Sequence, residues 1–259
     1  MHRMAGSDKR EANPAIMSLG RASDGELVLL YSSDCRYDSP FRVSRRTDAP
    51  ERQMIAIVDY KAGNLTSVAA ALNHLGHRCE ITDRAERIRA ADRVIIPGVG
   101  AAGATMENLI ALELTSTLRD DVARTGKPFL GICIGIQVLF DYSAEDDQKC
   151  LGIIPGEVVR FPSSVDGRPL KVPQIGWNRV RQSRPHPIFH GVPDNSHFYF
   201  VNSYHPVPSD PAVSIATSDY GVTFTAAIAR DNVIATQFHL EKSGTAGLRM
   251  LDNFCRLKI

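Results

Sequence analysis

The part of the sequence that most constrains the fold begins at residue 54. From there, short apolar runs alternate with amphipathic segments, a pattern typical of a sheet covered by helices on both faces. Three apolar runs are candidates for buried parallel strands: residues 55–58, 94–96 and 129–132. Two amphipathic segments are predicted helices, each ended by a glycine: residues 66–75 before Gly76, and residues 105–124 before Gly126. The pattern predicts an α/β fold.

The second half of this region has a different character. After Gly152, β-branched and aromatic runs are separated by Pro, Asp and Gly turns, which is typical of antiparallel strands. The candidate strands are residues 157–161, 197–201, 222–229 and 233–238. We therefore expect one domain over residues 54–259, with a mixed sheet whose C-terminal section is antiparallel.

Residues 1–53 show no sustained periodicity and are predicted to be an extension, either poorly ordered or not part of the native product. The segment is rich in arginine, but its many Asp and Glu residues argue against a transit peptide. Met54 stands directly before the first apolar run, so a translation start there would give a domain of ordinary length. The domain boundary is therefore placed between residues 53 and 54.

Composition excludes several classes of function. Lys plus Arg total 30 against 29 acidic residues, a net charge of +1 that offers no general attraction to nucleic acid or anionic membrane. No apolar run approaches the roughly 18 residues that a membrane-spanning helix needs. The five cysteines are scattered and include no CxxC pair, which indicates neither a disulfide framework nor a thiolate metal site. A cytoplasmic protein without a metal or cofactor is expected.

One cysteine stands in a pattern that suggests chemistry. Residues 131–135 read Gly-Ile-Cys-Ile-Gly between an apolar strand and an apolar helix, the cysteine form of a nucleophile elbow. A sharp turn crowds the positions two before and two after Cys133, and the two glycines remove the side chains that would clash. The free amides of the following helix favour the thiolate, and the Ile134 amide would supply half of an oxyanion hole. On this motif alone, a small buried core residue is the more frequent interpretation of such a cysteine.

A candidate base lies near the C-terminus. His239 and Glu241 follow a strand, and their two-residue spacing lets both side chains project to the same side of an extended segment. A histidine oriented by a carboxylate can take the thiol proton and later protonate a leaving amine. An isolated His-x-Glu is more often a solvated strand end, so it is the combination with the elbow that supports a Cys-His-Glu triad.

Taken together, these segments resemble the class I glutamine amidotransferases, which hydrolyse glutamine and hand ammonia to a synthase. Residues 171–178 (KVPQIGWN) and 198–204 (FYFVNSY) further resemble the glutaminase subunits of imidazole glycerol phosphate synthases. Other similar stretches are residues 59–68, 97–100, 151–157 and 247–254, so the resemblance covers about residues 54–259. It implies a three-layer sandwich with a flavodoxin-like central sheet and no cofactor.

The resemblance also implies roles for further residues. The segment 97–100 (PGVG) would be an oxyanion strand whose amide near Val99 or Gly100 turns toward the reacting carbonyl, and Gln137 and Glu145 would hold the amino-acid end of L-glutamine. Gly63, Asn64 and Trp177 would lie near the interface with a (β/α)₈-barrel cyclase, the partner in a heterodimer. The ammonia would be used there to make imidazole glycerol phosphate and an aminoimidazole carboxamide ribotide (AICAR) in histidine biosynthesis.

Three positions depart from the family pattern. Leu240 replaces the proline usual between the His and Glu, Gln174 and Ile175 replace His-Met, and Asn202 replaces a His. Because proline would fix a backbone dihedral, Leu240 leaves the placement of Glu241 open. Two other functions remain possible from the sequence: a related amidotransferase that feeds a different synthase, for example in sugar modification, and a catalytically silent regulatory subunit.

Overall fold

The computed structural model describes residues 18–21, 27–30 and 53–258. The chain divides into two compact units, residues 1–49 and residues 50–259. In the first unit, β1 (Ser18–Arg21) pairs antiparallel with β2 (Leu27–Leu30). Most of the predicted extension lies outside the described residues.

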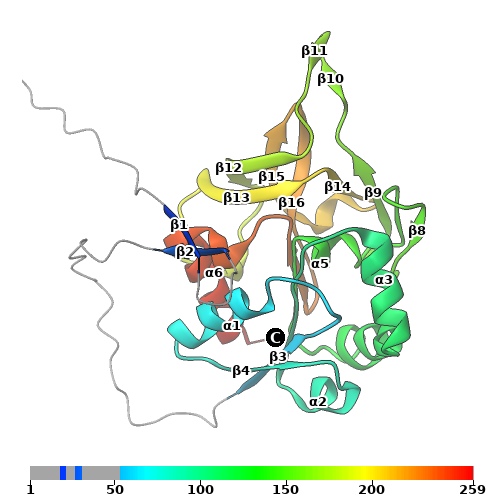
Figure 1. Cartoon of the computed structure of the whole chain (residues 1–259), viewed down its shortest axis with the longest axis vertical. Helices are drawn as coiled ribbons and strands as arrows, with labels where there is room; N and C mark the ends of the chain where they lie inside the picture. Colours follow the sequence, from blue (N-terminus) through cyan, green and yellow to red (C-terminus); the bar gives the residue numbers. More distant parts are fainter. Residues whose placement is uncertain (1–17, 22–26, 31–52, 259) are drawn as a thin grey trace, which may run out of the picture. The chain divides into compact units, whose positions relative to one another are not determined.

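A nine-stranded mixed sheet forms the centre of the second unit, with the order β13-β12-β15-β16-β17-β6-β5-β3-β4 (Figure 1). All pairings from β4 to β17 are parallel, and all pairings from β17 to β13 are antiparallel. The parallel strands are β3 (Met54–Val58), β4 (Arg78–Thr82), β5 (Arg93–Ile96), β6 (Phe129–Ile132) and β17 (Val233–Thr236). The antiparallel strands are β12 (Gln174–Gln182), β13 (Ser196–Asn202), β15 (Ser214–Tyr220) and β16 (Val222–Arg230). The predicted change from parallel to antiparallel pairing is confirmed, but β17, expected in the antiparallel section, pairs parallel with β6 and antiparallel only with β16.

Helices cover both faces of the sheet because alternate strand residues are buried on opposite sides. Ile55 and Ile57 belong to one apolar cluster, whereas Ala56 and Val58 belong to another. The first cluster includes side chains of α1 (Leu65–His74) and α6 (Gly244–Arg256), and the second includes those of α2 (Ala85–Ala90) and α3 (Ala102–Ala111). In Figure 1, α1 and α6 lie together, away from α3. The predicted three-layer sandwich is confirmed.

Smaller elements complete the second unit. A four-stranded sheet has the order β14-β9-β7-β8, and β10 and β11 form a hairpin that projects from the sheet in Figure 1. These strands are β7 (Tyr142–Ser143), β8 (Gln148–Lys149), β9 (Gly156–Arg160), β10 (Ser164–Val165), β11 (Arg168–Pro169) and β14 (Tyr204–Pro208). The short helical turns are α5 (Ile134–Gln137), η2 (Pro187–Phe189), η3 (Pro211–Val213) and η4 (Leu240–Lys242).

The prediction of one continuous helix over residues 105–124 is wrong. The chain instead forms α3, then α4 (Leu114–Ser116) and a π-helix, η1 (Thr117–Ala123), with a break at Glu113, which has a φ of 56°. After the buried Leu109, helical spacing would place residue 113 in the core, but the next buried side chain is Leu114. The break shifts the apolar face by one residue and leaves the charged Glu113 exposed.

Candidate active site

Cys133 occupies a sharp turn between β6 and α5, as its elbow motif predicts. Its backbone has φ 57° and ψ −108°, outside the regions that non-glycine residues usually adopt. A Cβ on Gly135 would lie 2.1 Å from the Ile96 carbonyl oxygen, and one on Gly131 would lie 2.7 Å from the Gly135 carbonyl oxygen. Both glycines are therefore required by close backbone packing. The following helix is a single turn, shorter than the apolar sequence suggested.

His239 and Glu241 meet in the protein interior. The Nδ1 atom of His239 lies 2.7 Å from Oε1 of Glu241, and neither side chain is exposed to solvent. The His239 backbone N–H donates to the Tyr199 carbonyl at 3.0 Å, which anchors the histidine to β13. Among the described residues, Nε2 of His239 is buried without a hydrogen-bonding partner, and the ring is close enough to Cys133 to interact electrostatically with it.

This arrangement favours a charged imidazole. Burial alone would lower the pKa of His239, but the adjacent Cys133 sulfur and the Glu241 carboxylate outweigh it and raise that pKa to about 9. Burial likewise disfavours the Glu241 carboxylate, yet hydrogen bonding and attraction to His239 hold the Glu241 pKa below its ordinary value. The site can therefore keep a proton on His239 near neutral pH, where a leaving amine would need it.

Leu240 does not displace Glu241. The segment Leu240–Lys242 forms a 3₁₀ turn, and the Leu240 side chain is fully buried in the core cluster that includes Phe238. The Ser243 hydroxyl donates to the His239 carbonyl and accepts from the Tyr199 amide, which ties the turn to the neighbouring strand. Packing and these hydrogen bonds thus replace the constraint that proline would impose.

The segment predicted to be an oxyanion strand lies directly after β5. The Tyr60 hydroxyl donates to the Pro97 carbonyl at 2.8 Å, and a Cβ on Gly98 would overlap that hydroxyl. Val99 is 38% exposed, and Gly100 has a φ of 123°, which only glycine adopts readily. Ile134 is the first residue of α5, so its amide has no partner within the helix.

The two predicted substrate-binding residues, Gln137 and Glu145, lie in different parts of the site. Gln137 is buried, and its Nε2 donates to the Tyr204 carbonyl at 3.2 Å and to Oε1 of Gln237 at 3.1 Å. Glu145 lies beside the start of α3 and accepts from the Ala102 amide at 2.9 Å. Gln137 therefore belongs to the surroundings of Cys133, whereas Glu145 is held at the helix that follows the oxyanion segment.

Sequence reasoning missed Gln237 and the role of Tyr60. Gln237 is fully buried, and its Nε2 lies 3.9 Å from the Cys133 sulfur. Its position two residues before His239 in an extended segment was the available signal, because such residues share a side. Tyr60 carried no comparable signal, since its contact with Pro97 depends on the tertiary fold.

Two of the departures from the family pattern face each other. Gln174 on β12 pairs in register with Asn202 on β13, and both side chains are buried. Their carbonyl oxygens, Oε1 and Oδ1, lack hydrogen-bonding partners within the described part of the chain, while Nδ2 of Asn202 donates to the Tyr204 carbonyl at 2.9 Å. The two replacements thus occupy one cross-strand site, where a change in one side chain bears directly on the other.

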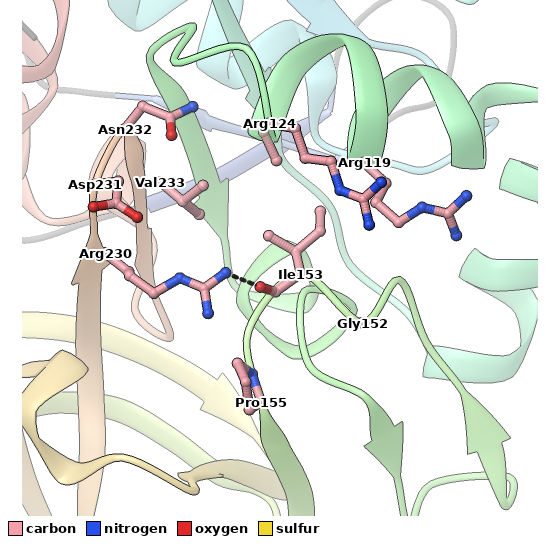
Figure 2. A pocket seen from close by; sticks show the side chains of 10 residues that line it. Arg119, Arg124, Gly152, Ile153, Pro155, Arg230, Asp231, Asn232 and Val233 are labelled. Carbon is pink, nitrogen blue, oxygen red and sulfur yellow. Dashed lines mark hydrogen bonds between the residues drawn. The ribbon is translucent and has the colours of Figure 1, made fainter.

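A separate pocket of about 290 Å³ lies at the opposite end of the parallel strands (Figure 2). It is lined by Val233 at the start of β17, whereas Cys133 follows the end of the neighbouring β6. Three arginines face it, but Arg230 donates to the Ile153 carbonyl, and Arg119 and Arg124 both pair with Asp120. These arginine charges are already engaged, and the pocket is remote from the cysteine.

Comparisons with known proteins identify the family to which the chain belongs. The model of the family described as glutamine amidotransferase class-I matches residues 56–257. The chain belongs to the class-I glutamine amidotransferases. A protein named imidazole glycerol phosphate synthase subunit HisH, from Dehalococcoides mccartyi, is 49% identical over 207 residues, covering 80% of this chain and 98% of that relative. A protein of the same name from Aromatoleum aromaticum is 50% identical over 206 residues, covering 77% of this chain and 96% of that relative.

Solved structures of other proteins share the fold of this amidotransferase at low sequence identity. A glutamine amidotransferase from Thermotoga maritima has a TM-score of 0.54 and 15% identity, covering 79% of this chain and 83% of its own. The glutaminase domain of a Trypanosoma brucei CTPS has a TM-score of 0.53 and 13% identity, covering 80% of this chain and 95% of its own. Within the described residues, the amidotransferase has no helix long and apolar enough to span a membrane.

Proposed function

We propose that this amidotransferase is the glutaminase subunit of an imidazole glycerol phosphate synthase and that it hydrolyses glutamine at Cys133. The observation that carries the catalytic part is the buried set of Cys133, His239 and Glu241, with Glu241 bonded to Nδ1 of His239 and Nε2 left without a partner among the described residues. The synthase assignment is supported by HisH relatives at about half identity, which are covered almost end to end.

In the first half of the reaction, the Cys133 thiolate attacks the carboxamide carbon of glutamine and forms a tetrahedral intermediate. The Ile134 amide, together with an amide at Val99 or Gly100, stabilises the developing oxyanion. His239 then gives its proton to the departing nitrogen, so that ammonia leaves and a glutamyl thioester remains on Cys133. Gln137 and Glu145 hold the amino-acid end of the substrate.

In the second half, neutral His239 takes a proton from water as the water oxygen attacks the thioester carbon. The carbon–sulfur bond breaks, glutamate is released, and the proton returns the site to its starting state. Glu241 stabilises the charged imidazole in both halves without itself becoming protonated. The products are one glutamate and one ammonia for each glutamine and water consumed.

The ammonia passes to a partner, a (β/α)₈-barrel cyclase, which makes imidazole glycerol phosphate and AICAR. An exposed apolar surface supports the interaction: Ile175 is 60% exposed and Trp177 is 49% exposed, both on β12. Trp177 packs edge-on against Tyr199, whose carbonyl holds the His239 amide. A partner bound on this surface would therefore be separated from His239, the base of the triad, only by Tyr199.

The test is glutamine turnover by the purified chain, with and without the cyclase from the same genome. We expect little hydrolysis by the chain alone and strong stimulation by the cyclase with its nucleotide substrate bound. Growth of a histidine auxotroph that lacks its own glutaminase subunit would confirm the pathway. Failure to restore growth with a well-folded chain that still hydrolyses glutamine would point to a different synthase.

A further inference from the structure

The side chain of Asn64 contacts the triad, although Asn64 lies near the N-terminal end of the domain and the triad histidine and glutamate lie near its C-terminal end. Its Nδ2 donates to Oε1 of Glu241 at 2.6 Å, the oxygen that also lies 2.7 Å from the ring of His239. Glu241 is fully buried, whereas Asn64 is only partly buried and lies between the exposed Gly63 and the helix α1. A surface loop thus contributes a hydrogen bond to the buried carboxylate.

The side chain of Asn64 bonds to Glu241 in place of the helix-capping hydrogen bond that its position would normally allow. Asn64 is the N-cap residue of α1, a position where an asparagine side chain normally accepts from the first free amides of the helix. Here the side chain makes no capping bond, and the backbone adopts a left-handed conformation with a φ of 74°. The residue forgoes a cap and occupies a less favourable backbone region while its amide contacts Glu241.

The hydrogen bond from Asn64 affects the ionisation of Glu241 and, through it, of His239. Burial works against an ionised Glu241, and the bonds from His239 and Asn64 are among the influences that lower the Glu241 pKa. The groups that raise the pKa of His239 are Cys133 at the elbow and Glu241 on η4. If Glu241 loses a donor, its carboxylate becomes less stable or rotates, and the charged imidazole loses support.

We propose that Asn64 is a positioning residue that holds Glu241 toward His239 and so sustains the proton on His239 during glutamine hydrolysis. The inference rests on the proposed role of the triad. It also connects two parts of the site, because a Cβ on the neighbouring Gly63 would lie 3.2 Å from a methyl group of Val99. The loop at residues 63–64 therefore adjoins both the oxyanion segment and the triad carboxylate.

The experiment compares Asn64→Gly and Asn64→Asp in the complete complex with saturating cyclase. Glycine tolerates the left-handed backbone and removes the donor, while aspartate keeps the shape and places a second carboxylate against Glu241. We expect kcat for glutamine to fall by about tenfold to a hundredfold, the range for a lost bond to a charged group, with KM nearly unchanged. In Asn64→Gly the alkaline limb of the pH profile, set by the His239 pKa of about 9, should move to lower pH, whereas the added carboxylate of Asn64→Asp should not lower it, because a nearby negative charge favours the charged imidazole.

A matched control tests the loop itself. Lys61 also has a positive φ, but its side chain is exposed and pairs with Asp83, so Lys61→Gly loosens the same loop without touching the triad. It should leave kcat within about twofold, as expected for a surface substitution. Adding Asn64→Gly to Glu241→Ala should cause no further loss of kcat, because the Asn64 amide would already have lost its acceptor.

A readout that does not require the partner separates this inference from the proposed function. The pKa of the His239 imidazole can be followed in the chain alone by NMR titration of the histidine rings, with the native chain and with Asn64→Gly. A lower His239 pKa in Asn64→Gly would support the inference even if no cyclase stimulated the chain. An unchanged His239 pKa, or an undiminished loss of kcat in the Glu241→Ala background, would overturn it.

Discussion

At the scale of single residues, the reactivity of Cys133 depends on where the backbone places it. The strained turn holds the cysteine at the end of β6, between the amides of α5 and the ring of His239. The elbow motif and the His-x-Glu spacing contained this information, because both are local patterns with a direct geometric meaning. The bond from Asn64 to Glu241 did not appear in any pattern, since it joins residues that are 177 positions apart.

The elbow glycines give the first prediction. Gly135→Ala should destabilise the protein by roughly 1–3 kcal/mol and abolish most glutamine turnover, because the new Cβ would force the elbow away from the Ile96 carbonyl. Urea unfolding measures the first effect, and glutaminase assays of the complex measure the second. Gly126→Ala is the control: it meets no atom within 4 Å and should cost only the strain of its positive φ. A fully active Gly135→Ala variant would contradict the packing argument.

The raised pKa of His239 gives the second prediction. Because this pKa is about 9, the imidazole stays protonated at neutral pH and loses its proton only as the pH rises through about 9. The rate of thioester formation should therefore fall at alkaline pH, where His239 can no longer protonate the leaving ammonia. Single-turnover kinetics across the alkaline range would show this limb. In Glu241→Gln the limb should move to lower pH, and an unchanged limb there would count against the assigned pair.

At the scale of elements, three of the parallel strands (β3, β5 and β6) and the helix-ending glycines followed from the sequence, because they depend on short apolar runs and on backbone chirality. Gly76 and Gly126 both adopt a φ of 81°, as the ends of the predicted helices require. The edge strand β4 and the helix α2 were not predicted, since β4 is half polar and α2 buries a single side chain, Ile88. The break at Glu113 was also missed, because it depends on how α3 and η1 pack on the sheet.

That break gives the third prediction. Glu113 is exposed and has a φ of 56°, a conformation that glycine adopts without steric cost. Glu113→Gly should stabilise the protein by up to about 1 kcal/mol, measured as an increase in the urea midpoint without a change in slope. Glu107→Gly lies within α3 and should instead destabilise by about 1 kcal/mol. If both variants lost stability equally, the break would not be the strained point that its dihedral indicates.

At the scale of the whole molecule, family membership and the sheet order agree on one amidotransferase domain. The family model matches residues 56–257, and relatives are covered over 95% or more of their own length. The N-terminal segment lies before all the residues of the proposed site. Its contribution to folding did not follow from composition, because a segment without periodicity gives no indication of its contacts.

The fourth prediction concerns this N-terminal segment. A chain that begins at Met54 should fold, bind the cyclase and hydrolyse glutamine at a rate within about twofold of the full chain, since its core is intact. Thermal unfolding and glutamine turnover of both forms, measured side by side, would test this. A shortened chain that folds but no longer responds to the cyclase would assign residues 1–53 a role in the complex.

The central claim is that Cys133 is the nucleophile of a glutaminase whose base and orienter are His239 and Glu241. The most direct measurement is the rate of ammonia release from glutamine by the complete complex, with the native chain and with Cys133→Ala. Alanine leaves the fold of the elbow nearly unchanged but cannot form the thioester. We predict that the rate falls to background while the cyclase still accepts externally supplied ammonia. Unchanged glutamine hydrolysis by the Cys133→Ala complex would contradict the account.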